Sequence, residues 1–361
     1  MVNLIQNSVE NVVRTGILKH FSNIVFSFFG ILSSAVFAQQ SVDDFVPLES
    51  FGANPGELSA SYISVTENNS ALVVLLHGCV QNGEKLANQS GFTALAKNYG
   101  FSLLVPQQHT TNNIKDCFNW FSAQDIEKDS GELLSLKNMI SSFKEQTKSS
   151  DVFIVGLSAG GAMASTLLST YPELFNAGAI IAGIPYPCAD NLTKAISCMR
   201  FGPSQSPKEL AKIVKGDQSH NSATQWPRLS IWTGNDDKVV NPKNAQFLAR
   251  QWAALSLNTS NSQSSINRNK ANQSNVRQPS IIKHKTTKHQ GYQKTVWKNV
   301  KQQVAVELIE VDGLGHGLMV KPNEKYGGSE GDFLLSSVLA SAEEIVKFWQ
   351  LKERKIDEIH K

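Results

Sequence analysis

The stretch "VGLSAGGAMA", residues 155–164, contains the pattern G-x-S-x-G around Ser158. Residues 152–155 before it are β-branched or aromatic, which favours a strand, and the largely apolar residues 162–168 after it favour a helix. Small residues surround the serine, as a sharp strand-to-helix turn requires. The segment therefore predicts a strand, a tight turn that exposes Ser158, and a helix. The alternative is an ordinary glycine-rich turn in which Ser158 is only a small residue.

Outward from this unit, predicted strands alternate with predicted helices along the chain. The expected strands are residues 60–65, 71–76, 101–106, 152–155, 177–185, 229–234 and 304–311, and the expected helices are residues 85–99, 129–146, 162–168, 241–255 and 341–354. The helix at 129–146 opens with Asp129 three residues before Glu132, which is typical of a capping box. The alternation predicts an α/β fold with a mostly parallel central sheet and helices on both faces, in a single domain without internal repeats.

The N-terminal residues read as a secretory signal rather than as part of the fold. Arg14, Lys19 and His20 precede the apolar run at residues 21–38, and Val36 and Ala38 fit small-residue cleavage. We predict a signal peptide at residues 1–38, a catalytic domain at residues 39–361, and an extracellular or periplasmic location. The long segment before the apolar run leaves an uncleaved anchor or a mis-assigned start as the alternative. A stable membrane partner is not expected, because the run is shorter than the roughly 20 apolar residues of a membrane span.

Four cysteines in an exported chain favour two disulfides, for which three pairings exist. Cys188 and Cys198 are close in a loop-like stretch, so we pair them, which leaves Cys79 with Cys117. Four buried free thiols are the alternative. A cysteine-only zinc site is disfavoured because no C-x-x-C spacing occurs.

Residues 256–301 interrupt the alternation, with nine Lys or Arg and no Asp or Glu. We interpret this segment as an inserted, solvated loop, with adsorption to an anionic surface as the alternative. The whole chain carries a net charge of only +3, which does not indicate a nucleic-acid partner.

A serine hydroxyl attacks a carbonyl only when a base takes its proton and a carboxylate orients that base. In α/β-hydrolases these residues follow the serine in the order acid, then histidine. His316 is the preferred base because "VELIEVDGLGHG" (residues 306–317) places it beyond a strand, between glycines that let the ring be exposed. The other histidines after Ser158 lie in polar or basic loops or at the end of the chain, and are His220, His284, His289 and His360.

For the acid, "LSIWTGNDDKVV" (residues 229–240) puts two aspartates in the loop after a strand. Asp237 is the choice and Asp236 the runner-up. Asp312 is nearer to His316 in sequence but lies on the same strand end, from which it reaches the imidazole less easily. A turn or a helix N-cap near Asn241 and Pro242 is the structural alternative for these aspartates.

Acyl transfer also needs N–H donors for the developing oxyanion. One candidate is the amide of Ala159, directly after the serine. The second is the amide of Cys79 in "LLHGCVQNGE" (residues 75–84), where Gly78 permits close backbone approach. A Cys79–Cys117 bond would stiffen this loop. We interpret His77 as a loop residue that holds the turn through hydrogen bonds.

Five motifs together carry a family resemblance, namely "LHGCVQN" (76–82), "CFNWF" (117–121), "GLSAGGAMA" (156–164), "GNDDKVVNP" (234–242) and "GLGHG" (313–317). They resemble the poly(3-hydroxybutyrate) depolymerase esterases, secreted α/β-hydrolases that include feruloyl and acetylxylan esterases, and the similarity runs from about Ala71 to about Trp349. The resemblance implies Ser158 as nucleophile, His316 as base, Asp237 as acid, and the amide of Cys79 in the oxyanion hole. It also implies Trp120 near the substrate, with a core aromatic as the alternative, and the type 1 order of the oxyanion loop before the nucleophile.

The expected function is hydrolysis of carboxylic esters through an acyl-enzyme, without a metal or organic cofactor. Hydroxybutyrate polyesters or oligoesters are the first substrate class, and plant-wall feruloyl or acetyl esters the second. A peptidase and a non-catalytic binding protein of the same fold are weaker alternatives. Two features depart from the family pattern. The chain ends soon after its last predicted helix, where a polymer-binding module is usual, and the basic segment has no counterpart in the family.

Overall fold

The computed structural model describes residues 45–65, 70–216, 225–258, 284–299 and 301–353. The predicted signal peptide and its cleavage site after Ala38 lie outside these residues, as do His220, His360 and the first part of the basic segment. None of the helices in the described ranges combines the length and the apolar composition that crossing a membrane requires.

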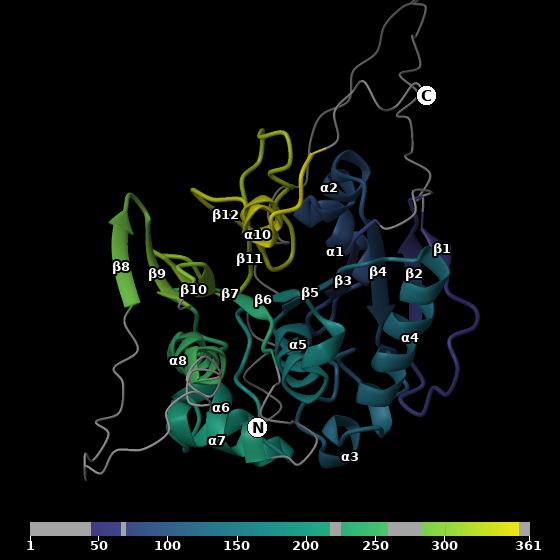
Figure 1. Ribbon diagram of the computed structural model, residues 1–361, viewed down its shortest axis with the longest axis horizontal. Helices are drawn as coiled ribbons and strands as arrows, with labels where there is room; N and C mark the ends of the chain where they lie inside the picture. The colour runs from purple at the N-terminus through teal and green to yellow at the C-terminus, as the bar shows by residue number, and fades with distance from the viewer. Residues whose placement is uncertain (1–44, 66–69, 217–224, 259–283, 300, 354–361) are drawn as a thin grey trace, which may run out of the picture. The chain divides into compact units, whose positions relative to one another are not determined.

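A twisted sheet runs through the described part of the chain (Figure 1). Its strands are β1 (Val46–Pro47), β2 (Ser59–Ile63), β3 (Leu72–Leu76), β4 (Ser102–Gln107), β5 (Val152–Leu157), β6 (Ala177–Ile181), β7 (Arg228–Gly234), β8 (His284–His289), β9 (Tyr292–Lys298) and β10 (Val304–Val311). They lie in the order β1-β2-β4-β3-β5-β6-β7-β10-β9-β8. The six strands from β4 to β10 pair in parallel, and the two strands at each end pair antiparallel. A separate parallel pair joins β11 (Leu318–Val320) and β12 (Leu334–Ser336).

Helices cover both faces of this sheet, as the sequence predicts. On the upper face in Figure 1 lie α1 (Gly83–Ser90), α2 (Phe92–Tyr99) and α10 (Ser341–Trp349). On the lower face lie α3 (Ala123–Ile126), α4 (Gly131–Thr147), α5 (Ala159–Thr170), α6 (Leu192–Phe201), α7 (Pro207–Gly216) and α8 (Lys243–Asn258). A short 3-10 turn, η2 (Pro172–Leu174), follows α5.

The central strands are apolar on both sides because each side faces a helix layer. In β3, Leu72, Val74 and Leu76 belong to one core cluster, whereas Val73 and Leu75 belong to the other. All five residues are fully buried. This near-continuous apolar run is the signature of a parallel strand covered on both faces.

Local signals set several helix boundaries. The side chain of Asn82 accepts a hydrogen bond from the amide of Lys85 and so caps α1. Gly91, at φ +92°, ends α1 and begins α2, so the single helix expected at 85–99 is two helices. A Cβ atom at Gly91 would lie 2.5 Å from the carbonyl oxygen of Tyr326, which explains why the break is a glycine.

The capping box expected at Asp129 and Glu132 is wrong. Helix α4 has Ser130 at its N-cap, and the Asp129 amide donates to the Tyr171 hydroxyl instead of to Glu132. The Glu132 carboxylate is buried and accepts from the amide of Asn119 at 2.8 Å. A tertiary partner has therefore replaced the local one.

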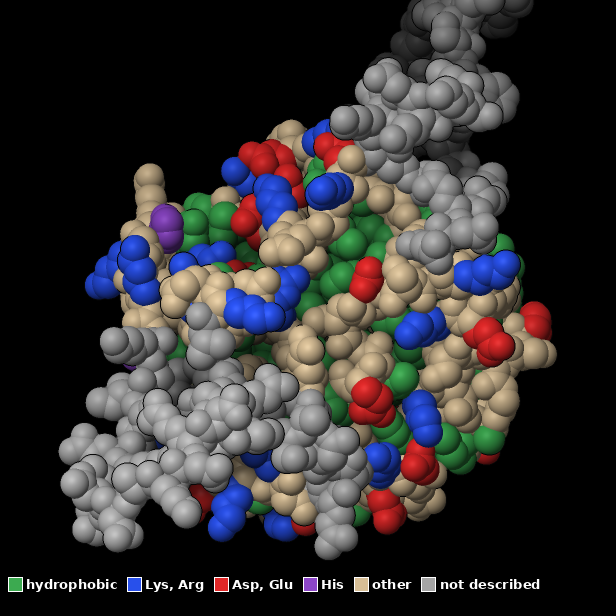
Figure 2. All heavy atoms as spheres, in the orientation of Figure 1, with side chains coloured by type: hydrophobic (Ala, Val, Ile, Leu, Met, Phe, Trp, Pro, Cys, Tyr) green, Lys and Arg blue, Asp and Glu red, His purple; other side chains and the backbone are tan. Residues whose placement is uncertain are grey.

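The basic segment is also only partly a loop. Residues 284–289 and 292–298, expected as solvated loop, form the β8–β9 hairpin and extend the sheet beyond β10. All six residues of β8 are exposed, whereas Trp297 of β9 is buried and packs beside His284. Figure 2 shows Lys or Arg side chains, in blue, on this side of the molecule. The hairpin lacks the apolar alternation by which strands are recognised, which is why the sequence did not reveal it.

Candidate active site

Ser158 lies at the turn between β5 and α5, at the carboxyl end of a central parallel strand. Its backbone has φ +54° and ψ −116°, a strained conformation for a residue with a side chain. The amide of Ser158 donates to the carbonyl of Ile181 on β6 at 2.9 Å, which holds the turn against the neighbouring strand. Ser158 is partly exposed although the strand before it is buried.

The two glycines of the motif are required by contacts between backbones. A Cβ atom at Gly156 would lie 2.2 Å from the carbonyl oxygen of Gly160. A Cβ atom at Gly160 would lie 2.4 Å from the carbonyl oxygens of both Leu76 and His77, at the end of β3. The same glycine thus lets the start of α5 pack directly on the loop that carries Cys79.

Three residues that are far apart in the sequence meet at this turn. His316 follows β10, and its Nε2 lies 2.9 Å from Oγ of Ser158. Its Nδ1 lies 2.7 Å from Oδ2 of Asp237, which follows β7. The structure therefore brings together the serine, histidine and aspartate that the sequence analysis selected.

The carboxylate of Asp237 is held on its other side by backbone donors. Its Oδ1 accepts from the amides of Val239 and Val240, each at 2.8 Å, and its side chain is fully buried. These bonds leave Oδ2 to face the imidazole. The interpretation of Asp237 as a turn residue and its interpretation as the acid are thus compatible, because Oδ1 bonds to the turn and Oδ2 contacts the imidazole.

The runner-up acids point elsewhere. Asp236 is exposed, and its amide donates to the carbonyl of Leu314 at 2.9 Å. Asp312 is also exposed and accepts from the side chain of Asn235 at 3.0 Å. His284 and His289 lie on β8, where His284 packs at a tilt beside Trp297 and His289 stacks on Tyr292.

The two candidate oxyanion donors flank the serine. Ala159 is the first residue of α5, so its amide has no acceptor within the helix. The amide of Cys79 donates to no group of the described residues. The loop of Cys79 lies against the serine, since a Cβ atom at Gly78 would be 3.4 Å from Cβ of Ser158.

Both disulfides are formed in the structure, with Cys79 bonded to Cys117 and Cys188 bonded to Cys198. Trp120 is 8 % exposed, belongs to the core cluster on the α4 and α5 side, and meets Phe121 edge to face at 5.5 Å. The core interpretation describes its surroundings, and a contact with substrate stays a prediction.

Sequence reasoning missed several residues that shape this site. Gln81 accepts from the amide of Gly78 at 2.7 Å and donates to the carbonyl of Asp332 at 3.3 Å. The ring of Phe333 lies 6.1 Å from that of His316, edge to face. Gln81 lies inside the motif "LHGCVQN", so its position in the sequence could have indicated a role in the oxyanion loop. No sequence feature near Phe333 indicates a contact with His316.

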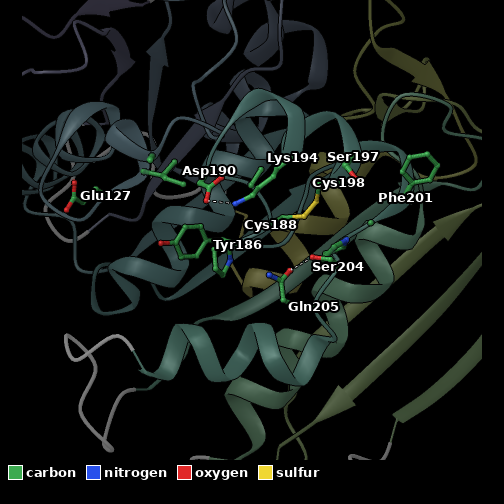
Figure 3. A pocket seen from close by; sticks show the side chains of 16 residues that line it. Glu127, Tyr186, Cys188, Asp190, Lys194, Ser197, Cys198, Phe201, Ser204 and Gln205 are labelled. Carbon is green, nitrogen blue, oxygen red and sulfur yellow. Dashed lines mark hydrogen bonds and ion pairs between the residues drawn. A yellow bond between two sulfur atoms is a disulfide. The ribbon is translucent and has the colours of Figure 1, made fainter.

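A cavity of about 630 Å³ lies beside the second disulfide, between α3 and α6 (Figure 3). It is lined by Tyr186, Cys188, Asp190, Lys194, Cys198, Phe201 and their neighbours, and Lys194 pairs with Asp190 at 2.7 Å. Ser158, His316 and Asp237 do not line this cavity. Within the described residues, no cluster of three or more His, Cys, Asp or Glu side chains is arranged to hold a metal ion.

The parallel sheet, the serine at a strand-to-helix turn, and the acid and histidine after later strands define an α/β-hydrolase. The chain belongs to the Esterase PHB depolymerase family, whose model matches residues 61–278. It is a carboxylic ester hydrolase, as the names of its relatives also indicate.

Individual relatives support the same assignment. Poly(3-hydroxyalkanoate) depolymerase C of Paucimonas lemoignei is 31% identical over 325 residues, which cover 88% of this chain and 72% of that protein. Feruloyl esterase B of Talaromyces stipitatus is 31% identical over 210 residues, which cover 54% of this chain and 56% of that protein. The solved acetyl xylan esterase from Aspergillus awamori aligns with a TM-score of 0.65 at 20% identity, covering 85% of this chain and 99% of that one, which is a likeness of fold.

Proposed function

We propose that this esterase is a serine hydrolase that uses Ser158, His316 and Asp237 as a catalytic triad. The observation that carries the proposal is the unbroken chain of contacts from Oγ of Ser158 through the imidazole of His316 to the carboxylate of Asp237. Asp237 keeps the proton on Nδ1, so that Nε2 is free to accept the serine proton. It also stabilises the imidazolium that forms when that proton moves.

In the proposed reaction, Oγ of Ser158 attacks the ester carbonyl while its proton passes to Nε2 of His316. The amides of Cys79 and Ala159 donate to the oxyanion of the tetrahedral intermediate. The intermediate collapses to an acyl-serine, and the leaving alcohol takes the proton from His316. A water molecule, deprotonated by His316, then attacks the acyl-serine. When the acyl–oxygen bond breaks, His316 returns the proton to Oγ of Ser158 and the acid is released.

For the substrate, we propose polyesters or oligoesters of 3-hydroxyalkanoic acids. The depolymerase relative supports this choice because its similarity extends over 88% of the chain, compared with 54% for the feruloyl esterase. Feruloyl or acetyl esters of plant cell walls are the second candidate, supported by the feruloyl and acetylxylan esterases among the relatives. An extracellular or periplasmic location agrees with two disulfides, which persist in oxidising compartments.

The test compares the purified protein with its Ser158→Ala variant. Both are assayed on 4-nitrophenyl butyrate, hydroxybutyrate oligomers, amorphous polyester granules and feruloylated or acetylated xylan. Removal of the nucleophile is expected to lower kcat by at least about 10⁴-fold, and labelling by a fluorophosphonate is expected to disappear.

The control is Ser141→Ala, which removes an exposed hydroxyl on α4 and is expected to leave kcat within about twofold of the wild type. A folded wild type that is inert on every ester would overturn the triad and favour a binding role. A preference for xylan esters over hydroxybutyrate oligomers would overturn the proposed substrate class alone.

A further inference from the structure

His77 is a buried titratable residue to which the proposed reaction gives no part. It ends the stretch "LVVLLH" (residues 72–77), is completely buried, and packs on the ring of Phe118 at 4.9 Å between ring centres. Burial lowers the pKa of its imidazole to about 4, so the ring is neutral at neutral pH. It lies directly before the loop that carries Cys79.

Both ring nitrogens of His77 have backbone partners that fix its tautomer. The amide of Gln108 lies 3.1 Å from Nε2, and an amide can only donate, so Nε2 is the acceptor. Nδ1 therefore carries the proton, which it donates to the carbonyl of Gly78 at 2.7 Å. The ring thus bridges β4, to which Gln108 is joined, and the Gly78 peptide.

This bond determines which way the next amide points. The Gly78–Cys79 peptide is trans, since the cis peptide of the described residues is Tyr186–Pro187. In a trans peptide the C=O and the following N–H point in opposite directions. A Gly78 carbonyl held toward His77 therefore turns the Cys79 N–H away from the ring, on the loop that lies against Ser158.

The neighbouring groups of the loop are fixed separately. The Gly78 amide donates to Gln81, and the Val80 amide donates to the carbonyl of Lys115, both at 2.7 Å. The side chain of Cys79 is bonded to Cys117. These contacts hold the loop at its ends but not the rotation of the Gly78–Cys79 peptide plane, which the hydrogen bond from His77 does hold.

Gln108, which orients His77, is itself held by a buried carboxylate. Its side-chain amide donates to Oε1 of Glu132, and Asn119 donates to the same carboxylate through its amide at 2.8 Å and its side chain at 2.7 Å. Burial raises the pKa of Glu132 to about 7. The residue that donates to His77 thus belongs to a polar network that reaches Glu132 on α4.

We infer that His77 is a positioning residue that orients the Cys79 amide toward the oxyanion through its hydrogen bond to the Gly78 carbonyl. The inference rests on the proposed function, since it concerns the oxyanion hole of that reaction. If the hydrogen bond is lost, the Gly78–Cys79 peptide can rotate. The Gly78 carbonyl oxygen can then face the oxyanion in place of the Cys79 N–H. The rate of acylation falls, while binding of the ground-state ester is little changed.

Two substitutions separate the two hydrogen bonds of His77. In His77→Asn the side-chain NH₂ occupies the place of Nδ1 and retains the donor to Gly78, while the acceptor for Gln108 is lost. In His77→Gln the side-chain oxygen occupies the place of Nε2 and retains the acceptor, while the donor to Gly78 is lost. Both variants remove the buried ring, and the shorter Asn leaves the larger cavity, so a loss of packing alone would harm His77→Asn more than His77→Gln.

The measured quantity is kcat per active serine. The concentration of active serine is obtained by titrating Ser158 with a fluorophosphonate until labelling is complete. We expect His77→Gln to lower kcat by about 10²-fold to 10³-fold with KM within about threefold, as for the loss of one oxyanion donor. We expect His77→Asn to stay within about tenfold of the wild type. The affinity for a boronic acid that forms a tetrahedral adduct on serine falls in parallel with kcat.

A merely structural role predicts a different result. Both variants would then lose folded protein, His77→Asn more than His77→Gln, and kcat per labelled serine would stay at the wild-type value. That result overturns the inference, as does His77→Gln with full kcat. If neither variant folds, the tautomer of His77 in the wild type is determined from the nitrogen chemical shifts of its imidazole. An Nε2–H tautomer between pH 6 and 8 overturns the inference.

The Ser158→Ala variant distinguishes a failure of the proposed function from a failure of the role of His77. Activity that survives in Ser158→Ala contradicts the proposed function itself. Activity that depends on Ser158 but not on the His77 donor contradicts only the role of His77.

Discussion

At the scale of the residue, Asp237 shows how one carboxylate serves two purposes. Its Oδ1 closes the turn after β7 through the amides of Val239 and Val240, and its Oδ2 meets His316. The two backbone hydrogen bonds fix the Asp237 side chain independently of its contact with the imidazole. The orientation of His316 therefore depends on a carboxylate that has little freedom of its own.

The adjacent pair Asp236 and Asp237 offers a matched test of this orientation. Asp237→Asn keeps the shape but replaces the charged acceptor, so the favoured tautomer of His316 is lost and kcat is expected to fall by about 10³-fold to 10⁴-fold. Asp236→Asn, at the exposed neighbour, is expected to stay within about twofold of the wild type. Steady-state kinetics on 4-nitrophenyl butyrate measure both. Equal losses in the two variants would contradict the assignment of Asp237.

At the scale of the element, the junction between α1 and α2 depends on close packing as well as on backbone conformation. Gly91 has φ +92° and lies against the carbonyl of Tyr326, in the segment that follows β11. A second contact with the same segment is the hydrogen bond from the amide of Ser329 to the carbonyl of Gln89 at 2.8 Å. The upper helix layer is thus joined to the region that follows the candidate histidine.

A pair of glycine substitutions separates the two contributions. Gly91→Ala introduces both the unfavourable φ and a clash at 2.5 Å, and we expect it to lower the free energy of unfolding by about 3 kcal/mol or more. Gly313→Ala has a similar positive φ of +66° but no atom within 4 Å of the added Cβ, so a loss of about 1 kcal/mol is expected. Urea denaturation measures both values, and equal losses would contradict a role for the contact with Tyr326.

The elements that the sequence predicted are those with strong local patterns. The apolar runs at β3, β5 and β7 predict buried strands because both of their faces are buried. The glycines around Ser158 predict the tight turn. The hairpin β8–β9 and the short strands β11 and β12 were not predicted from the sequence, because their pairing is set by tertiary contacts. Glu132 was assigned to a helix cap for the same reason, since its partners Gln108 and Asn119 belong to another part of the chain.

The candidate site followed from the sequence to the extent that its residues lie at strand ends. Ser158, Asp237 and His316 each follow a predicted parallel strand, and the carboxyl ends of parallel strands meet at one edge of a sheet. Their mutual distances, the buried network behind His77 and the ring of Phe333 beside His316 required the structure. No local pattern encodes a contact between residues that the fold alone brings together.

At the scale of the whole molecule, the two disulfides differ in what they hold. Cys79–Cys117 closes a sequence separation of 38 residues and ends on the loop of the candidate oxyanion donor. Cys188–Cys198 closes a separation of 10 residues beside the cavity of Figure 3. Their loss is therefore expected to have different consequences for activity.

Replacing each pair by alanine tests this difference. On the chain-entropy model, Cys79→Ala with Cys117→Ala lowers the free energy of unfolding by about 4 kcal/mol, and Cys188→Ala with Cys198→Ala by about 3 kcal/mol. Only the first pair is expected to lower kcat per active serine, by about tenfold or more, because the loop that carries the Cys79 amide loses its bond to Cys117. Denaturant titration and active-site titration measure the two effects. An unchanged kcat in the first pair would show that the bridge has no part in catalysis.

The last strand of the sheet, β8, leaves one row of backbone groups without a partner strand among the described residues. Such an edge invites a strand of another copy to add to it, the first step of amyloid-like stacking. Lys285 and Lys288 lie on this edge strand, and Lys298 lies on the strand behind it, where Lys294 is paired with Glu307 at 2.7 Å. Two copies that met edge to edge would bring like charges together, so we expect the basic composition of this hairpin to oppose aggregation through the open edge of the sheet.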